Sequence, residues 1–210
     1  MIIDNSSPSL IFLPGWGFPS SMWKNIVALI NHHQSHVSTC VELSDALSAE
    51  SFPPKAVLIG WSLGGLIAMK HCLRYPGRYQ KLILINSAPY FSKFTGRYKH
   101  LAENNFSHFK KMFLRWVFYP DTVTSPLYAD QFKNEQELLA QLSFLFETNY
   151  QTEYAKIDLP VFRIQGSSDV IVSHDIWPDR ANDRVKIITG GHALPFTHES
   201  EVSHLIKEFL

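Results

Sequence analysis

The sequence predicts an α/β fold with a mostly parallel central sheet that is covered by helices on both faces. Runs that are apolar at nearly every position, such as KAVLIG at 55–60 and KLILIN at 81–86, are typical of strands buried on both faces. Amphipathic stretches with helical spacing lie between such runs, for example at 63–74. This alternation of strands and helices favours a parallel sheet.

The expected elements follow one another along the chain. The first strand ends at Pro14-Gly15, and the helix after it starts behind a serine. The expected strands are 9–14, 36–43, 55–60, 81–86, 160–166 and 184–189, and the expected helices are 20–30, 63–74 and the closing stretch at 198–210. A short polar connection is expected before 55–60.

A stretch from about 90 to 157 interrupts the alternation and predicts a helical insertion over the sheet. Its apolar residues recur at helical intervals, as Ala102, Phe106, Phe109, Phe113 and Trp116 in one group and Leu138, Leu142 and Leu145 in another. A chain of 210 residues with 45% hydrophobic content supplies one well-filled core. We therefore expect a single domain, 1–210, with a helical lid insertion at about 90–157.

The composition excludes several classes of function. Nineteen basic residues balance nineteen acidic ones, so nothing in the net charge favours nucleic-acid binding. Cys40 and Cys72 lack metal-ligand spacing and are too few for a disulfide framework, which favours a reducing compartment. The N-terminus resembles no signal peptide, and no apolar run approaches the ~18 residues that span a bilayer. We expect a cytoplasmic monomer that needs no metal or cofactor and binds no membrane.

The segment Gly60-Trp61-Ser62-Leu63-Gly64 contains the candidate nucleophile. A GxSxG motif alone is weak, but this one follows a predicted buried strand and opens a predicted helix. In that setting a sharp turn projects the serine Oγ outward, and the two glycines avoid collisions with the neighbouring strand and helix. Ser62 is therefore the candidate nucleophile.

Serine needs a base to remove its proton and a carboxylate to orient that base. Asp169 follows the predicted strand 160–166, and His192 follows 184–189. The order Ser, Asp, His along the chain is the one that the α/β-hydrolase fold uses. Asp158 and Asp175 are weaker candidates for the acid, and His174 and His198 are candidates for a secondary role.

An oxyanion hole requires two N–H donors directed at the tetrahedral intermediate. Leu63, directly after the nucleophile, should supply the first backbone N–H. The loop LPGWGF after the first strand should supply the second, from Trp16. Because both roles use backbone atoms, the identity of the side chains does not test them.

LPGWGF, GWSLGGL, NSAPYF and GGHALPFTH together resemble the pimeloyl-ACP methyl ester carboxylesterases of biotin synthesis, the BioH type of α/β-hydrolase. The resemblance implies hydrolysis of the methyl ester of a pimeloyl chain carried on acyl carrier protein. It also implies functional positions at Trp16, Ser62, Leu63, Asp169 and His192, and an acyl-chain contact at Phe113, Leu114, Arg115, Trp116 and Val117. In contrast to that family, the leading strands are missing and the segment after 36–43 is shortened.

The insertion is also asymmetric in charge. Between 93 and 118 it carries six basic residues against the single acidic Glu103: Lys93, Arg97, Lys99, Lys110, Lys111 and Arg115. A basic face would attract an acidic partner such as acyl carrier protein, with Lys110, Lys111 and Arg115 as candidate contacts. A solvated helix face explains the same charges equally well.

Three other functions remain open from the sequence. A general short-chain carboxylesterase would use the same residues, because pocket size cannot be deduced from sequence. The menaquinone-pathway cyclohexadiene carboxylate synthase, a lyase, has a similar triad, although Trp61 and Leu66 look more like the biotin esterase. A catalytically silent binding scaffold is the alternative outside enzymes, and the retained Ser, Asp and His argue against it.

Overall fold

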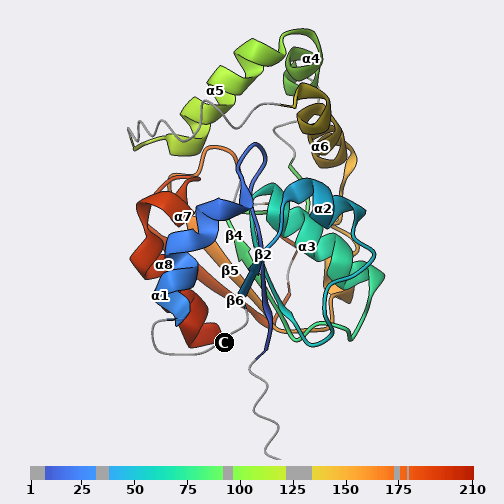
Figure 1. The fold of residues 1–210 in the computed structure, drawn as a ribbon, viewed down its shortest axis with the longest axis vertical. Helices are drawn as coiled ribbons and strands as arrows, with labels where there is room; N and C mark the ends of the chain where they lie inside the picture. The colour runs from blue at the N-terminus through green and yellow to red at the C-terminus, as the bar shows by residue number, and fades with distance from the viewer. Residues whose placement is uncertain (1–7, 32–37, 92–96, 122–133, 173–175, 179) are drawn as a thin grey trace, which may run out of the picture.

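The central sheet has six strands in the order β2-β1-β3-β4-β5-β6, and every neighbouring pair is parallel. The computed structural model describes residues 8–31, 38–91, 97–121, 134–172, 176–178 and 180–210 (Figure 1). The strands are β1 (Leu10–Leu13), β2 (Ser38–Cys40), β3 (Val57–Trp61), β4 (Lys81–Ile85), β5 (Val161–Gly166) and β6 (Asp183–Ile188). The predicted fold class is confirmed.

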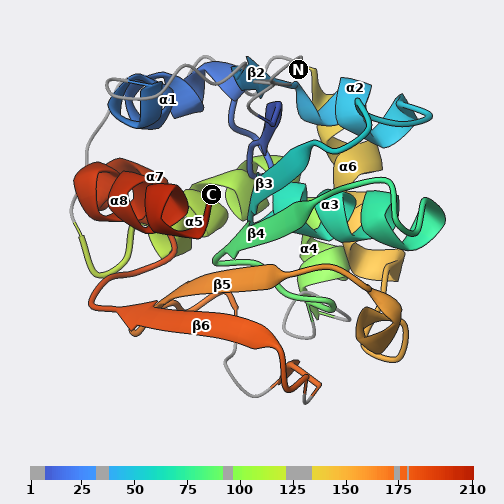
Figure 2. The same ribbon diagram turned by 90° about the horizontal axis from the view of Figure 1, so that it is seen from below.

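Helices cover both faces of this sheet. They are η1 (Ser20–Trp23), α1 (Lys24–Asn31), α2 (Leu43–Ser48), α3 (Leu63–Arg74), α7 (Leu194–Thr197) and α8 (Glu199–Phe209). Figure 2 shows α1 and α8 together on one face, with α2 and α3 on the other. The helices bury apolar stripes against the strands, as α8 does with Val202, Leu205 and Ile206.

The strand order reverses at β1, which lies between β2 and β3. The chain therefore leaves β1 towards one edge of the sheet and returns to build the other. In open parallel sheets such a reversal leaves a crevice at the carboxyl ends of the strands, where ligands bind. Leu13 at the end of β1 pairs with Gly60 of β3, so the turns after these strands lie side by side.

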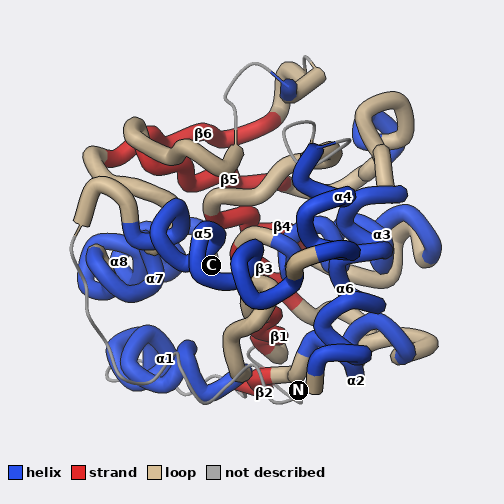
Figure 3. Tube along the Cα trace, turned by 90° about the horizontal axis from the view of Figure 1, so that it is seen from above, coloured by secondary structure: helices blue, strands red, loops and turns tan. Residues whose placement is uncertain are grey.

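The insertion between β4 and β5 is helical, as its spacing indicated. It comprises α4 (Arg97–Asn104), α5 (Phe106–Phe118), α6 (Glu135–Glu147) and the short η4 (Tyr154–Lys156). Asn105 and Asn134 cap α5 and α6, because each side chain accepts a bond from a backbone N–H three residues later. The helices α4, α5 and α6 lie above the carboxyl ends of the strands (Figures 1 and 3). Their action as a lid remains a prediction.

Two segments have features that the sequence did not specify. The strand predicted at 184–189 is β6, an edge strand, on which the exposed fraction is 48% for Val185 and 56% for Ile187. No strand pairs beyond it in the described part of the chain. The supposed polar connection contains α2, which buries Leu43 and Ala46.

Among the described residues, no helix is long and apolar enough to span a membrane.

Candidate active site

Ser62 lies in a tight turn between β3 and α3. Its φ of 53° and ψ of −122° place it in a conformation that non-glycine residues rarely adopt. An added Cβ on Gly60 would lie 2.4 Å from the Gly65 nitrogen, and one on Gly64 would lie 2.3 Å from the Leu13 carbonyl oxygen. Both glycines are therefore required by close approach, as the sequence predicted.

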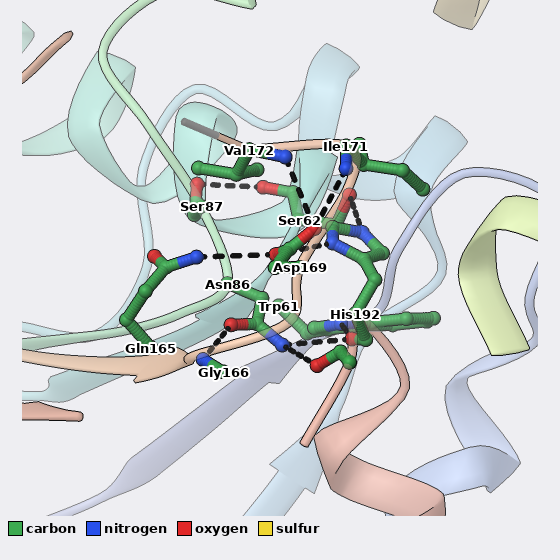
Figure 4. A network of polar contacts seen from close by, with 11 residues as sticks. Trp61, Ser62, Asn86, Ser87, Gln165, Gly166, Asp169, Ile171, Val172 and His192 are labelled. Atoms are coloured by element: carbon green, nitrogen blue, oxygen red, sulfur yellow. Dashed lines mark hydrogen bonds and ion pairs between the residues drawn. The ribbon is translucent and has the colours of Figure 1, made fainter. Parts of the chain in front are cut away.

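Ser62, His192 and Asp169 form one continuous hydrogen-bonded chain (Figure 4). The Oγ of Ser62 is 2.8 Å from Nε2 of His192, and Nδ1 of His192 is 2.8 Å from Oδ2 of Asp169. Since a carboxylate only accepts, Nδ1 carries the ring proton and Nε2 is left to accept the serine proton. The structure thus brings together three residues that are far apart in sequence.

The carboxylate of Asp169 is fixed by further donors. Its Oδ1 accepts bonds from the backbone N–H groups of Ile171, at 2.8 Å, and Val172, at 3.0 Å. Its Oδ2 also accepts a bond from Nε2 of Gln165, at 3.2 Å. Such bonds satisfy a buried charge and hold the carboxylate in one orientation towards His192.

The backbone around the site is held by three side chains to which the sequence assigned no role at the site. Ser87 Oγ donates to the carbonyl of Ser62 at 2.7 Å. Asn86 and Trp61 donate to the carbonyl of His192 at 2.9 and 2.8 Å. Asn86 and Ser87 directly follow the buried strand β4, so polar residues at the carboxyl end of a strand were the available signal.

The candidate oxyanion donors occupy adjacent turns. Trp16 and Leu63 each lie three positions beyond the paired residues Leu13 and Gly60. Leu63 is the first residue of α3, where backbone N–H groups point away from the helix and the dipole favours negative charge. Their participation in an oxyanion hole remains a prediction.

The side chain of Trp16 is buried in the insertion. It is 1% exposed, and its Nε1 donates to the carbonyl of Leu138 on α6 at 2.9 Å. Its ring packs edge-on against Phe106, Phe109 and Phe113 of α5. Trp16 therefore connects the turn after β1 to two helices of the insertion.

The predicted acyl-contacting segment lies on α5 and does not present one face. Phe113 and Val117 are buried, Leu114 and Trp116 are half-buried, and Arg115 is exposed. Successive helical residues project in different directions, so all five cannot line one channel. Among them, Phe113 packs against Trp16, with 4.9 Å between the ring centroids.

The basic residues of the insertion separate into different surroundings. Lys111 and Arg115 are exposed and four positions apart, which places them on one face of α5. Lys110 is half-buried, with its ammonium 4.8 Å from the centre of the Phe106 ring. Lys99 pairs with Glu147 at 3.7 Å, and Lys93 lies outside the described residues.

Of the competing residues, Asp158 and His198 are described, and neither joins the chain around Ser62. Asp158 is exposed, while Asp175 and His174 lie outside the described residues. His198 contacts Thr197 through Nδ1 at 2.8 Å.

A separate cavity of about 260 Å³ lies between α4 and α6. None of the predicted site residues lines it. Its lining consists of Ala102, Glu103, Leu139, Leu142, Ser143 and Phe146.

The chain is similar to a known protein family in sequence and to solved structures in backbone. The family model described as the alpha/beta hydrolase fold matches residues 33–199. The chain belongs to the α/β-hydrolase family. Solved structures have similar backbones: a hydrolase from Pseudomonas aeruginosa has a TM-score of 0.78 at 18% identity, covering 98% of this chain and 90% of its own. An enol-lactonase from Burkholderia xenovorans has a TM-score of 0.74 at 16% identity, covering 98% and 92%.

Curated α/β-hydrolase relatives carry a more specific name. A pimeloyl-[acyl-carrier protein] methyl ester esterase of Wigglesworthia glossinidia brevipalpis is 26% identical over all of this chain and 96% of its own length. The enzyme of the same name from Vibrio vulnificus is 24% identical over 97% of this chain and 91% of its own. These names agree with the enzyme class that the sequence predicts, a serine carboxylesterase, and the resemblance to that family is confirmed.

Proposed function

We propose that this α/β-hydrolase cleaves carboxylic esters through a covalent acyl-enzyme formed on Ser62. The observation that carries the proposal is the unbroken chain from Ser62 Oγ through the His192 ring to the Asp169 carboxylate, with both contacts at 2.8 Å. A serine hydroxyl is a weak nucleophile until an adjacent base takes its proton. This arrangement supplies the base and fixes its tautomer.

The proposed reaction has two halves. His192 Nε2 takes the proton of Ser62 while Oγ attacks the ester carbonyl, and the resulting imidazolium then protonates the leaving alkoxide. A water, deprotonated by the same nitrogen, next attacks the acyl-serine; the imidazolium then returns a proton to Ser62 Oγ, which releases the carboxylic acid and free Ser62. Asp169 orients the ring and stabilises its positive charge in both halves.

The negative oxygen of each tetrahedral intermediate needs donors already in place. The backbone N–H groups of Leu63 and Trp16 are the candidates, since their turns are adjacent and Leu63 begins α3. Removing one donor of this kind typically costs ~3 kcal/mol of transition-state stabilisation.

The substrate we propose is the methyl ester of pimeloyl-acyl carrier protein, which would yield methanol and pimeloyl-acyl carrier protein. Two observations support it. The relatives described above bear this activity in their names. The exposed Lys111 and Arg115 on α5 offer positive charge above the carboxyl ends of the strands, where an acidic carrier protein would deliver its acyl chain.

Labelling with a fluorophosphonate probe tests the nucleophile. We expect wild-type protein to be labelled and Ser62→Ala to be unlabelled. Ser203→Ala is a matched control, because Ser203 is also a buried serine and its Oγ donates to a carbonyl on the same helix. Unlabelled wild-type protein, or labelling that survives in Ser62→Ala, would refute the proposal.

Two substrates separate the carrier-protein esterase from a general short-chain carboxylesterase. We expect kcat/KM to be higher for the methyl ester on acyl carrier protein than for the free monomethyl ester. The charge reversals Lys111→Glu and Arg115→Glu should lower kcat/KM several-fold for the carrier-bound ester only. This decrease in kcat/KM should become smaller at high salt. Equal kcat/KM for both substrates, together with failure to rescue a biotin-requiring strain that lacks its own esterase, would favour the general esterase.

A further inference from the structure

Asn86 occupies a position between the two loops that carry Asp169 and His192. It directly follows β4, is fully buried and has a φ of 42°, in the left-handed region that asparagine tolerates better than most residues. Its own backbone N–H donates to the carbonyl of Ile164 on β5 at 2.9 Å. The residue is thus anchored to two neighbouring strands before its side chain makes any contact.

The side-chain amide of Asn86 joins both loops. Its Nδ2 donates to the carbonyls of Gly191 and His192, each at 2.9 Å, and its Oδ1 accepts the N–H of Gly166 at 2.7 Å (Figure 4). Gly166 ends β5, three residues before Asp169. Both amide hydrogens and the amide oxygen are therefore used, and every bond goes to the backbone of His192, of Gly191 beside it, or of Gly166 at the start of the loop that carries Asp169.

Trp61 adds a second support from the other side. It directly precedes Ser62, and its Nε1 donates to the carbonyl of His192 at 2.8 Å. The carbonyl of His192 consequently receives bonds from Asn86 at the end of β4 and Trp61 at the end of β3. The backbone of the base is tied to the residue beside the nucleophile and to the loop of the acid at the same time.

We propose that Asn86 and Trp61 are positioning residues for the ester hydrolysis proposed above, and that they act by fixing the His192 backbone relative to Ser62 and Asp169. Neither side chain is hydrogen-bonded to the reacting groups. Their hydrogen bonds act on the backbone, at the carbonyl of His192 and the N–H of Gly166, and the Trp61 ring also packs against the His192 ring, with 5.4 Å between the centroids. The inference rests on the proposed function for its kinetic consequence, whereas its geometric consequence can be measured without any substrate.

Asn86→Asp is the sharpest variant. Aspartate has the same shape and also tolerates the left-handed backbone, and one carboxylate oxygen still accepts the Gly166 N–H. The other oxygen replaces the amide donor and faces two carbonyl oxygens, which repel it. Since a displacement of about 1 Å at a catalytic group can cost on the order of 10²-fold in rate, we expect kcat to fall by about that factor while KM changes little.

Trp61→Phe tests the second support and has a matched control. The variant keeps an aromatic ring against Phe18, Phe196 and the His192 ring but removes the Nε1 donor. Trp23 is an equally buried tryptophan whose Nε1 has no hydrogen-bond partner in the described part of the chain. We expect a smaller fall in kcat for Trp61→Phe than for Asn86→Asp, and no fall for Trp23→Phe.

The ¹H resonance of the His192 Nδ1 proton gives a readout that does not depend on activity. We expect it to be unchanged in Trp23→Phe and shifted or broadened in Asn86→Asp, because the His192–Asp169 contact is altered. In Trp61→Phe the informative change is broadening, because the indole that packs on the His192 ring is lost and this alone shifts the resonance. Folded variants with wild-type kcat and an unchanged resonance would overturn the inference. If Asn86→Asp does not fold, Trp61→Phe decides alone. Inactive wild-type protein with the expected shifts would refute the ester hydrolysis and leave the positioning intact.

Discussion

Two buried histidines, His192 and His71, lie in regions of the molecule with opposite character. The exposed fraction is 0% for His192 and 1% for His71. His192 lies at the carboxyl edge of the sheet, where both ring nitrogens are hydrogen-bonded to polar side chains. His71 lies on α3, where its Nε2 contacts the carbonyl of Ala46 on α2 at 3.0 Å and its ring packs against Phe52.

The difference lies in what each site does with a proton. Nδ1 of His71 has no hydrogen-bond partner among the described residues. Burial lowers the pKa of His71, and the nearby charges of Lys70 and Arg74 lower it further, although the bond to Ala46 opposes them. Protonated His71 would place an unmatched charge in an apolar contact, whereas protonated His192 would face the carboxylate of Asp169. Burial alone therefore does not distinguish the two histidines, whereas the hydrogen-bond partner of Nδ1 does: His192 has Asp169, and His71 has none among the described residues.

Removing each histidine in turn should give the largest contrast. We expect His192→Ala to lower kcat by on the order of 10⁶-fold, since a serine without its base loses nearly all triad catalysis. His71→Gln should leave kcat unchanged, because the glutamine amide can replace the donor to Ala46 and the site is elsewhere. Steady-state hydrolysis of a small ester measures both. Comparable losses in the two variants would show that the contrast is wrong.

Asp169→Asn should give the next largest effect. The amide keeps the shape of the carboxylate but can donate to Nδ1, which favours the wrong tautomer of His192 and leaves Nε2 protonated. The expected fall in kcat is about 10⁴-fold. Circular dichroism and thermal unfolding should show a folded protein, so that the loss reports on chemistry. Asp158→Asn is the control, because that exposed carboxylate should be dispensable.

Gln165→Leu should have a smaller effect on the same region. It removes one donor to Oδ2 of Asp169, at 3.2 Å, but leaves the backbone donors from Ile171 and Val172 to Oδ1. We expect kcat to fall by roughly three- to tenfold, equivalent to about 1 kcal/mol. A loss as large as that of Asp169→Asn would mean that Gln165, and not the backbone, holds the carboxylate.

The smallest effect concerns stability at acidic pH. Because the pKa of His71 in the folded state is below its ordinary value of 6.5, the unfolded chain binds more protons as the pH falls through that value. The contribution of neutral His71 to the free energy of unfolding is therefore fully present above about pH 6.5 and decreases as the pH falls below that value. The free energy of unfolding of His71→Gln should differ from that of wild type by no more than about 1 kcal/mol at pH 7.5. Between pH 7.5 and pH 5 it should decrease less in the variant than in wild type. Urea unfolding across this range measures the change, and parallel pH profiles would contradict it.

The sequence by itself determined the sheet, the turn at Ser62 and the choice of Asp169 and His192. Buried parallel strands are apolar at almost every position, and a GxSxG turn requires its glycines, so both are recorded in local patterns. These patterns specified β3, α3 and the carboxyl ends of β5 and β6 closely enough to locate the residues that meet at the site.

Only the tertiary structure decided which side chains hold the backbone of the site and which strand lies exposed at the edge of the sheet. Asn86 and Gly191 are far apart in sequence, and no local pattern records that the amide of one will reach the carbonyl of the other. The exposure of Val185 and Ile187 on the edge strand β6 is also a tertiary property, because side chains on a strand are buried only where other elements pack on that face of the sheet. Likewise, the spacing that predicted α5 could not show that Phe113 contacts Trp16 while Arg115 faces outward. Local spacing fixes which residues share a face, whereas the packing of distant segments determines what that face meets.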